Sequence, residues 1–513
     1  MRKGIAFFIM TCMLLTGCGR APALEPASTS TASTAAEPKK TTAETTVAVQ
    51  HEESIGESTT AATTATTTTA TTVETKVAAT TAETTTGPVA TTVSTTAATT
   101  ATAATTKPAT TTAATTVETT TKPATTTAST TAATTTTVAT TTAATTTVVT
   151  TTVREEPVEI PESGMRNIST MQIVEEMGVG INLGNTYEAC GDWIAQWGDG
   201  TPESYETAWG SPVITKPMIE GYKTAGFDSL RIPVAWSNLM GEDYTISEEY
   251  MEAVKEVVDW ALDSELYVII NLHYDNGWLE EFPTNKWNCM RKYSRIWEQV
   301  CEEFKDYGDY LIFESQNEEL GWDSVWNKWA GTKGKAESYA LVNEVNQRFV
   351  DIVRSSGGNN AERHLLISGY QTGIETTCDP LFKIPDDPAG RCAISVHYYT
   401  PAVFAIISED ADWGKARSTW GTSADFAELE QQMDMMKENF VDKGIPVIIG
   451  EYGCPTENKD MDSVRLFLKS VCEYALERDM CPVLWSTPGH IYDRNTCSIP
   501  DKELRELYRK AGR

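Results

Sequence analysis

The sequence predicts an α/β protein in which eight parallel strands and their helices close into a (β/α)8 barrel. Past Met177 the chain alternates eight short apolar runs, typical of strands, with longer segments in which apolar residues recur every three or four positions. Such alternation is typical of parallel strands joined by right-handed helical crossovers. No G-x-G-x-x-G string follows the first run, which disfavours an open dinucleotide-binding sheet.

The strand-like runs follow one another at intervals that leave room for a helix between them. They span 178–183, 229–234, 267–272, 310–314, 364–368, 393–396, 446–449 and 481–485. Helix-period segments between them include 249–264, 293–304, 339–354, 426–440 and 464–476. Polar residues stand at the carboxyl ends of most runs. Since these ends open on one face of a TIM barrel, the polar side chains are expected to meet there.

The first part of the chain differs sharply in composition from the rest. No aromatic residue occurs between Phe8 and Tyr187, and Thr and Ala dominate residues 28–152. Ordering such a segment would cost roughly 1 to 2 kcal/mol of backbone entropy per residue with little apolar burial to offset it. We therefore expect residues 24–158 to be a long disordered low-complexity linker and residues 159–513 to be one folded domain that holds all fourteen Trp.

The N-terminus has the pattern of a targeting segment, and residues 1–23 are predicted to be a signal peptide. Two basic residues, Arg2 and Lys3, precede an apolar stretch at 5–15 that is too short to span a bilayer. The string Leu-Thr-Gly-Cys ending at Cys18 resembles a bacterial lipobox, in which that cysteine is lipidated. The alternative is an ordinary signal peptide cut near residues 21–23. Either case predicts an extracellular or cell-surface enzyme or binding protein.

Charge and cysteine usage exclude several classes of function. The net charge of -30 excludes electrostatically driven nucleic-acid binding and fits a protein that acts on an uncharged polymer. The nine cysteines past Cys18 form no C-x-x-C pair, so we expect no metal site and no cofactor. Cys378 and Cys392 could close a disulfide loop, but buried free thiols are the favoured state. A monomer is expected.

Two glutamates, Glu318 and Glu451, each lie just past an apolar run. Hydrolysis of a glycosidic bond requires two such carboxyl groups, one as acid/base and one as nucleophile. Glu314 and Glu319 are close to Glu318 in the sequence and are the alternative candidates for its role. Neighbouring side chains on a strand point to opposite faces, so Glu319 should diverge from Glu318, whereas Glu314 should be a deeper, hydrogen-bonded core acid.

Three further residues are placed to act with these carboxylates. Arg231 is flanked by apolar residues, and a buried guanidinium requires a carboxylate partner. If that partner is Glu451, the cation should lower its pKa; the alternative is an ion pair with another acid. His273 and His397 stand at strand ends without a second ligand at helical spacing, which favours hydrogen bonding over metal binding.

Tryptophan is abundant in segments outside the predicted elements. A pyranose has a C–H face that stacks on an aromatic ring, so such residues around a barrel mouth predict a cleft for a long polysaccharide. The ten are Trp193, Trp197, Trp209, Trp278, Trp287, Trp322, Trp326, Trp329, Trp413 and Trp420. Trp260 and Trp297 lie on amphipathic segments and are expected to pack in the core.

Six strings taken together resemble one enzyme family. They are GINLGNT at 180–186, AWGSP at 208–212, GFDSLRIPVAW at 226–236, NE at 317–318, HYY at 397–399 and IGEYG at 449–453. In this order they resemble the catalytic domain of glycoside hydrolase family 5, and the first two resemble its endoglucanase-rich subfamily 4. The resemblance covers nearly all of residues 177–513.

The resemblance implies a (β/α)8 barrel and a retaining endo-β-1,4-glucanase, a cellulase acting on cellulose or related β-glucans. It implies Glu318 as acid/base and Glu451 as nucleophile. The residues that it places around them are Arg231, His273, Asn317, His397, Tyr399 and Trp485. Asn185, Tyr274 and Trp485 are expected to contact the substrate. Tyr274 departs from many relatives, which have a second His there, and Ser486 stands where an acidic residue is common.

Other functions on the same scaffold remain open from the sequence. Xyloglucan, mixed-linkage glucan and mannan are competing substrates. A catalytically silent carbohydrate-binding surface protein is the alternative outside the enzyme class.

Overall fold

The computed structural model describes residues 164–318, 320–321, 324–329 and 333–512. The predicted signal peptide at 1–23, its lipidation site Cys18 and the linker at 24–158 lie outside these residues. Glu319 and Trp322 also lie outside them.

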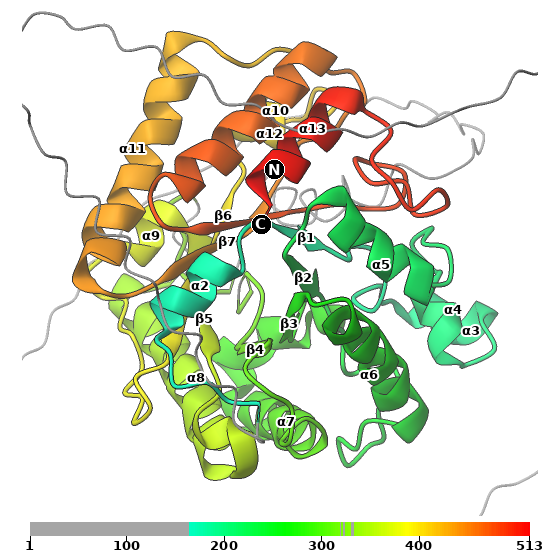
Figure 1. Ribbon diagram of the computed structural model, residues 1–513. Helices are drawn as coiled ribbons and strands as arrows, with labels where there is room; N and C mark the ends of the chain where they lie inside the picture. The colour runs from blue at the N-terminus through cyan, green and yellow to red at the C-terminus, as the bar shows by residue number, and fades with distance from the viewer. Residues whose placement is uncertain (1–163, 319, 322–323, 330–332, 513) are drawn as a thin grey trace, which may run out of the picture. The chain divides into compact units, whose positions relative to one another are not determined.

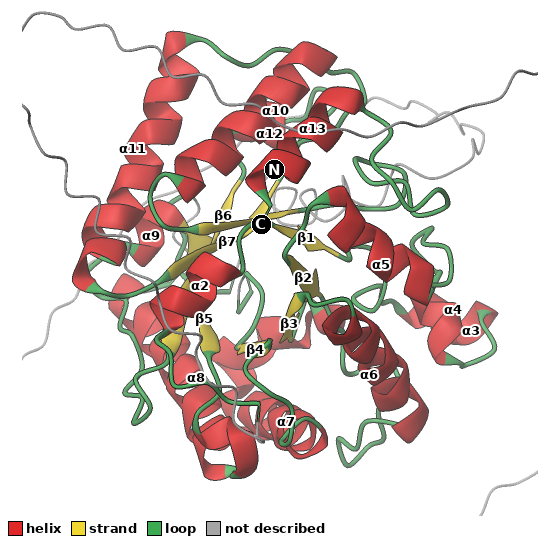
Figure 2. Ribbon diagram, in the orientation of Figure 1, coloured by secondary structure: helices red, strands yellow, loops and turns green. Residues whose placement is uncertain are grey.

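Eight parallel strands form a closed barrel, in which each strand pairs with the next and β8 pairs with β1 (Figures 1 and 2). The strands are β1 (Gly180–Asn182), β2 (Ser229–Ile232), β3 (Tyr267–Asn271), β4 (Leu311–Glu314), β5 (Leu365–Gly373), β6 (Cys392–Tyr398), β7 (Val447–Tyr452) and β8 (Cys481–Leu484). Each coincides with one of the predicted runs. The predicted fold class is therefore confirmed.

Helices surround the barrel, and the five predicted segments are all helical. The larger ones are α5 (Lys216–Ala225), α6 (Glu248–Asp263), α7 (Phe282–Glu303), α8 (Lys335–Ser355), α11 (Ser423–Asn439), α12 (Met461–Leu476) and α13 (Lys502–Ala511). Short helices are α2 (Thr170–Glu176), α3 (Asp192–Trp197), α4 (Pro202–Glu206), α9 (Ile374–Thr377) and α10 (Ala402–Ala405), with 3-10 turns η1 (Asp275–Glu281), η2 (Gly358–Ala361) and η3 (Val441–Lys443). Among the helices of the described residues, none is long and apolar enough to cross a membrane.

Helix α2 closes the end of the barrel at which the strands begin. A capping box between Ser169 and Gln172 starts the helix. Its buried residues Ile173, Val174 and the following Met177 pack in one apolar cluster with inward-facing strand residues such as Ile269, Ile312, Leu366 and Ile448. Figure 1 shows α2 in front of the barrel. The polar residues lie at the opposite end of the barrel, where the strands finish.

Strand register brings polar residues from different strands side by side. Examples of neighbouring polar pairs are Asn182 with Arg231, Asn271 with Glu314, and His397 with Glu451. The third pair follows a register shift between Val396 and His397. Such an irregularity re-aims a side chain.

The nine cysteines of the described residues are all free thiols. The disulfide considered between Cys378 and Cys392 is not formed; the Cys378 Sγ instead lies 3.7 Å from the Met435 carbonyl oxygen. Burial stabilises the neutral thiol and raises the pKa of Cys392.

Some of the tryptophans expected in loops lie on helices or are buried. Trp193 and Trp197 lie on α3 and Trp287 on α7, and all three are exposed on helices rather than in loops. Trp420 is buried. Trp297 is fully buried in the core, as predicted.

Candidate active site

The two carboxylates predicted from the sequence meet at the carboxyl end of the barrel. Glu318 follows β4 and Glu451 lies near the end of β7. One oxygen of each and a ring nitrogen of His397 all lie within 4.8 Å of one another. Retaining glycosidases hold their two carboxyl groups about 5 to 5.5 Å apart, whereas inverting enzymes need about 6.5 to 9.5 Å to admit a water. The arrangement therefore has the closeness of a retaining pair.

The two carboxyl groups have different surroundings. The Glu451 side chain is only 3% exposed, whereas that of Glu318 is 29% exposed. An accessible group can meet a leaving-group oxygen or a water. A buried group has its orientation fixed by its neighbours.

His397 bridges the pair from β6. Its Nδ1 lies 3.0 Å from Oε1 of Glu318 and 3.5 Å from Oε2 of Glu451. The side chain is almost fully buried. An N–H at this position donates to Glu318 while it faces Glu451, so one ring links both carboxyl groups.

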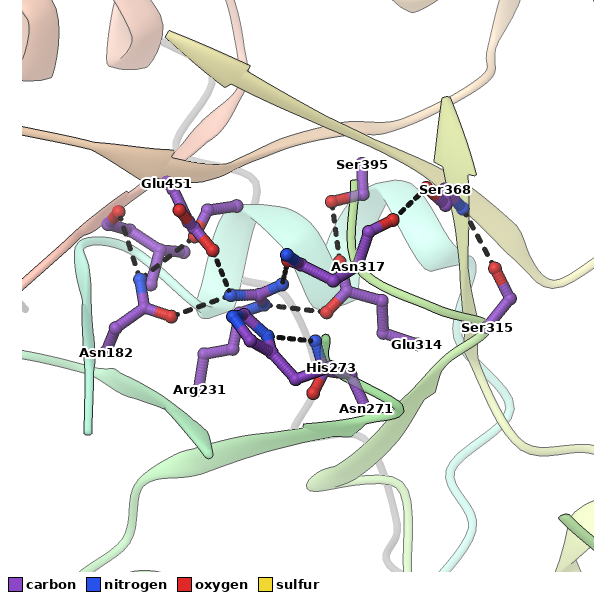
Figure 3. Close-up of polar contacts among 12 residues, drawn as sticks. Asn182, Arg231, Asn271, His273, Glu314, Ser315, Asn317, Ser368, Ser395 and Glu451 are labelled. Carbon is purple, nitrogen blue, oxygen red and sulfur yellow. Dashed lines mark hydrogen bonds and ion pairs between the residues drawn. The ribbon is translucent and has the colours of Figure 1, made fainter. Parts of the chain in front are cut away.

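Arg231, on β2, lies at the centre of the network (Figure 3). Its Nη1 donates to Oε1 of Glu451 at 2.8 Å and to Oδ1 of Asn182 at 2.9 Å. Its Nε donates to Oε2 of Glu314 at 2.6 Å, and its Nη2 donates to Oδ1 of Asn317 at 2.9 Å. The sequence left two partners open for this cation, and the structure gives it both, Glu451 and a second acid.

Glu314 is that second acid, and it is a buried, hydrogen-bonded group deeper in the barrel. Besides Arg231 it contacts Ser395, whose Oγ donates to Oε1 at 2.7 Å. Both oxygens of Glu314 are thus satisfied inside the barrel. Its side chain is 0% exposed, so unlike Glu318 it is closed off from a leaving group or a water.

Asn317 is held from two sides. Its amide oxygen accepts from Arg231, and its backbone carbonyl accepts from Oγ of Ser368 at 2.7 Å. Since the oxygen of the amide is engaged by the cation, the two N–H donors are directed elsewhere. Asn317 lines a small hollow together with Glu318, His273 and Tyr274, where these donors can serve a hydroxyl.

Tyr399 completes the surroundings of Glu451. Its hydroxyl donates to Oε2 at 3.0 Å, so both carboxylate oxygens of Glu451 are hydrogen-bonded. Burial and the nearby Glu451 and Glu318 raise the pKa of Tyr399 well above its ordinary value. The phenol therefore stays protonated and remains a donor.

The pKa of Glu451 differs from the sequence expectation. Burial raises it above the ordinary value, and Glu318 adds to the increase, while His397 and Arg231 act to lower it. The expected effect of Arg231 is present as one contribution. The net direction is upward because the removal of the carboxylate from water outweighs the cation, which also serves Glu314.

His273 and Trp485 form one wall of the site. Asn271 Nδ2 lies 3.2 Å from Nδ1 of His273 and donates to it. Burial and the nearby Arg231 and His397 lower the pKa of His273 well below its ordinary value, so the ring is neutral. Its plane is within 9° of that of Trp485, with centroids 5.9 Å apart.

Asn185 has a different setting from the other predicted residues. Its side-chain amide donates to the Trp209 carbonyl at 3.5 Å, and its backbone N–H donates to the buried Glu188. The first of these bonds joins the turn after β1 to the segment after α4, and neither involves the two candidate catalytic carboxylates. Within the carboxylate network, Asn182 was expected at the open face because it stands at the end of a predicted run, although no role was assigned to it. Ser395 was not predicted, because a Ser within an apolar run has no distinguishing signal.

Glu318, His397 and Glu451 could also provide donor atoms for a metal ion. A divalent cation there would lie next to the guanidinium of Arg231, which already neutralises Glu451 at 2.8 Å. Repulsion between the two cations in a buried site opposes this use. The same three groups are arranged for proton transfer without a metal.

Comparisons with known proteins give a family match for this chain. Residues 194–490 match the family described as Cellulase (glycosyl hydrolase family 5). Endoglucanase A of Ruminococcus albus is 38% identical over 355 residues, which span 66% of this chain and 92% of that enzyme.

Two solved structures are similar over the same region. A broad-specificity endoglucanase of family 5 subfamily 4 from an uncultured bovine rumen ciliate is 36% identical with a TM-score of 0.61, over 67% of this chain and 98% of that one. A family 5 xyloglucanase of Bacteroides ovatus, in complex with an XXXG heptasaccharide, is 30% identical with a TM-score of 0.60, over 69% of this chain and 80% of that one. The resemblance inferred from the sequence strings is thereby confirmed, and the chain belongs to glycosyl hydrolase family 5.

Proposed function

We propose that this protein is a retaining endo-β-1,4-glucanase with Glu318 as acid/base and Glu451 as nucleophile. The observation that carries the assignment of these roles is the pair of carboxyl groups within 4.8 Å of each other, one buried and held at both oxygens, the other open to the site. Membership of the family and the endoglucanases among its relatives support the same activity.

The reaction proceeds in two displacements. Glu451 attacks the anomeric carbon while Glu318 transfers its proton to the departing glycosidic oxygen, which leaves a glycosyl ester on Glu451. Glu318, now ionised, takes a proton from water, whose oxygen attacks the anomeric carbon and releases Glu451. Asn317 directs its N–H donors to the sugar 2-hydroxyl, a contact that strengthens in the transition state.

Azide rescue distinguishes the two carboxylates. Glu318→Ala should still form the glycosyl ester from substrates with good leaving groups, and azide should accelerate the second step to give a β-glycosyl azide. Glu451→Ala should lose activity by several orders of magnitude, and any azide product should be the inverted α-azide, identified by NMR. Glu314→Gln is the matched control, because it alters a carboxyl group of the same cluster that performs neither step. Azide rescue of Glu314→Gln with Glu318→Ala fully active would refute the assignment.

A hollow beside the site favours branched glucans as additional substrates. It has a volume of about 240 Å³ and lies among the segments after β6, β7 and β8, lined in part by Tyr399, Trp485, Thr487 and His490. Typical sites for drug-sized ligands begin at about 300 Å³, so this volume suits one sugar unit. The similar xyloglucanase supports this substrate. Reducing-sugar rates on carboxymethyl-cellulose, xyloglucan, mixed-linkage glucan and mannan would rank the candidates; activity on none would favour the silent binding protein.

The N-terminal residues are proposed to hold the enzyme outside the cell. Lipidation of Cys18 would anchor the chain, and residues 24–158 would act as the linker between that anchor and a monomeric catalytic domain at 159–513. Cys18→Ala should then shift the protein from the membrane fraction to the medium, and an unchanged partition would argue for an ordinary signal peptide. A chain starting near residue 159 should match the full-length enzyme on soluble substrate.

A further inference from the structure

A second buried polar cluster lies next to the site and contains Arg494, which sequence reasoning did not single out. Arg494 is only 2% exposed. It lies on the segment after β8, in a tight hairpin closed by an antiparallel bridge between Asp493 and Ser498. The hairpin directs a cation inward at the mouth of the barrel.

Arg494 joins three separate segments of the chain. Its Nη2 donates to the carbonyl of Gly184 after β1 at 2.6 Å and to that of Ser486 after β8 at 3.2 Å. Its Nη1 donates to Oγ of Ser211 at 2.9 Å. Gly184 and Ser211 belong to the GINLGNT and AWGSP strings, which contain none of the proposed catalytic carboxylates. The two strings thus have a shared physical partner.

Glu188 stabilises the turn after β1 that contains Gly184. It is 1% exposed and accepts backbone N–H bonds from Asn185 and, at 2.9 Å, from Thr186. Burial raises its pKa to about 7, and these bonds and Arg494 oppose the increase. The turn needs this support because Asn185 has a φ of 60°, which is uncommon for a residue with a side chain.

The turn forms the surface against which Trp485 packs. A Cβ placed on Gly184 would lie 3.0 Å from Cζ2 of the indole, so a side chain there would press on the ring. Gly184 also donates its N–H to the Ser486 carbonyl at 3.2 Å, the same oxygen that accepts from Arg494. Arg494 therefore contacts both Gly184, against which the Trp485 ring packs, and Ser486, the residue that follows Trp485.

We propose that Arg494 is a positioning residue that fixes the plane of Trp485 for stacking on a sugar of the glucan chain. It acts through the carbonyls of Gly184 and Ser486 rather than by touching substrate. The inference rests on the proposed function of the site. It gives the two strings a role in substrate binding that is distinct from the chemistry at Glu318 and Glu451.

A double-mutant cycle tests the inference in the full-length protein. Arg494→Met should raise KM for a soluble cello-oligosaccharide about tenfold, as expected for loss of one aligned stacking contact, with a much smaller change in kcat. Trp485→Ala should raise KM by a similar factor. If Arg494 acts through Trp485, the double variant should have nearly the KM of Trp485→Ala alone, because the two changes remove the same contact.

Arg363 provides the matched control. It is a second buried arginine that donates to backbone carbonyls, those of Phe304, Tyr307, Gly308 and Leu311, at the end of the barrel where strands begin. Arg363→Met should lower stability to a similar degree and leave KM unchanged. This variant separates loss of position at Trp485 from general loss of stability.

The outcomes are separable. An active wild type supports the proposed function whatever the cycle gives. If the KM factors of Arg494→Met and Trp485→Ala multiply in the double variant, or if Arg494→Met leaves KM unchanged, the inference is wrong. Should Arg494→Met fail to fold, Arg494→Lys replaces it in the same cycle, since it keeps the charge but lacks the planar fork that serves three oxygens.

Discussion

Replacement of Arg231 should move the acid limb of the pH–rate profile. The guanidinium is fully buried and donates to Glu451 at 2.8 Å and to Glu314 at 2.6 Å. Burial already raises the pKa of Glu451, and Arg231 opposes that increase. The nucleophile must be ionised, so kcat/KM falls as the pH drops below its pKa. Removal of the cation raises that pKa further, and the limb must therefore move to higher pH.

The size of the movement follows from the loss of one close opposite charge. Such a charge typically changes a carboxyl pKa by about 1 to 3 units, so Arg231→Met should move the limb upward by about that amount. At a pH below the acid limbs of both wild type and Arg231→Met, the variant should have a kcat/KM about tenfold lower than wild type for each pH unit by which its limb has moved. The variant also leaves two buried carboxylates without their cation, which costs about 3 to 5 kcal/mol of folding stability near neutral pH.

The assay is kcat/KM against pH on a soluble cello-oligosaccharide, with folding checked by denaturation at each pH. Arg231→Lys is the control, since it keeps a charge but serves fewer acceptors, and its limb should lie between those of wild type and Arg231→Met. The double variant Arg231→Met/Glu314→Gln removes the second unpaired acid and should recover part of the stability. Because a like charge is also removed, its limb should lie below that of Arg231→Met. A folded Arg231→Met enzyme with the wild-type limb would refute the reasoning.

Two further predictions concern neighbouring groups. Tyr399→Phe removes the 3.0 Å hydrogen bond to Glu451. A hydrogen bond to a charged group is worth about 1.5 to 3 kcal/mol, so kcat/KM should fall roughly tenfold to a hundredfold without a change in fold. An unaltered rate would mean that this bond does not orient the nucleophile. Burial raises the pKa of Glu188 from 4.5 to about 7, so the folded state binds more protons than the unfolded state between these values and loses stability as the pH rises through them. The loss of folding stability should be on the order of 3 kcal/mol and should be absent in Glu188→Gln. Stability measured by urea denaturation from pH 4.5 to 8 tests this. If wild type and Glu188→Gln change in parallel over that range, the prediction is wrong.

The barrel was predictable because its pattern is local. Eight apolar runs bounded by helix-period segments determine strand and helix without any knowledge of pairing. The position of Glu451 just past such a run was enough to place it at the open face. The same logic placed His397 and Asn317, since each comes just after a predicted apolar run.

Pairing across strands was not predictable, and the finer features of the site depend on it. The contact of Arg231 with both Glu314 and Glu451 requires three strands to be in register, and the position of His397 requires an irregularity next to Val396. The raised pKa of Glu451 depends on how far burial exceeds the effect of one shared cation. Arg494 lies in an irregular segment after β8, where neither periodicity nor a motif distinguishes it from a surface residue.

The sharing of Arg231 has a consequence for the charge that the site presents to substrate. Two carboxylates, Glu314 and Glu451, share one guanidinium, so the buried trio carries one net negative charge when both acids are ionised. The transition state of glycoside hydrolysis develops positive charge at the anomeric carbon, next to Glu451. A fixed negative charge in a site of low dielectric constant stabilises that state more than the uncharged substrate. If Arg231 instead paired with Glu451 alone, the pair would be neutral and this preference would be lost.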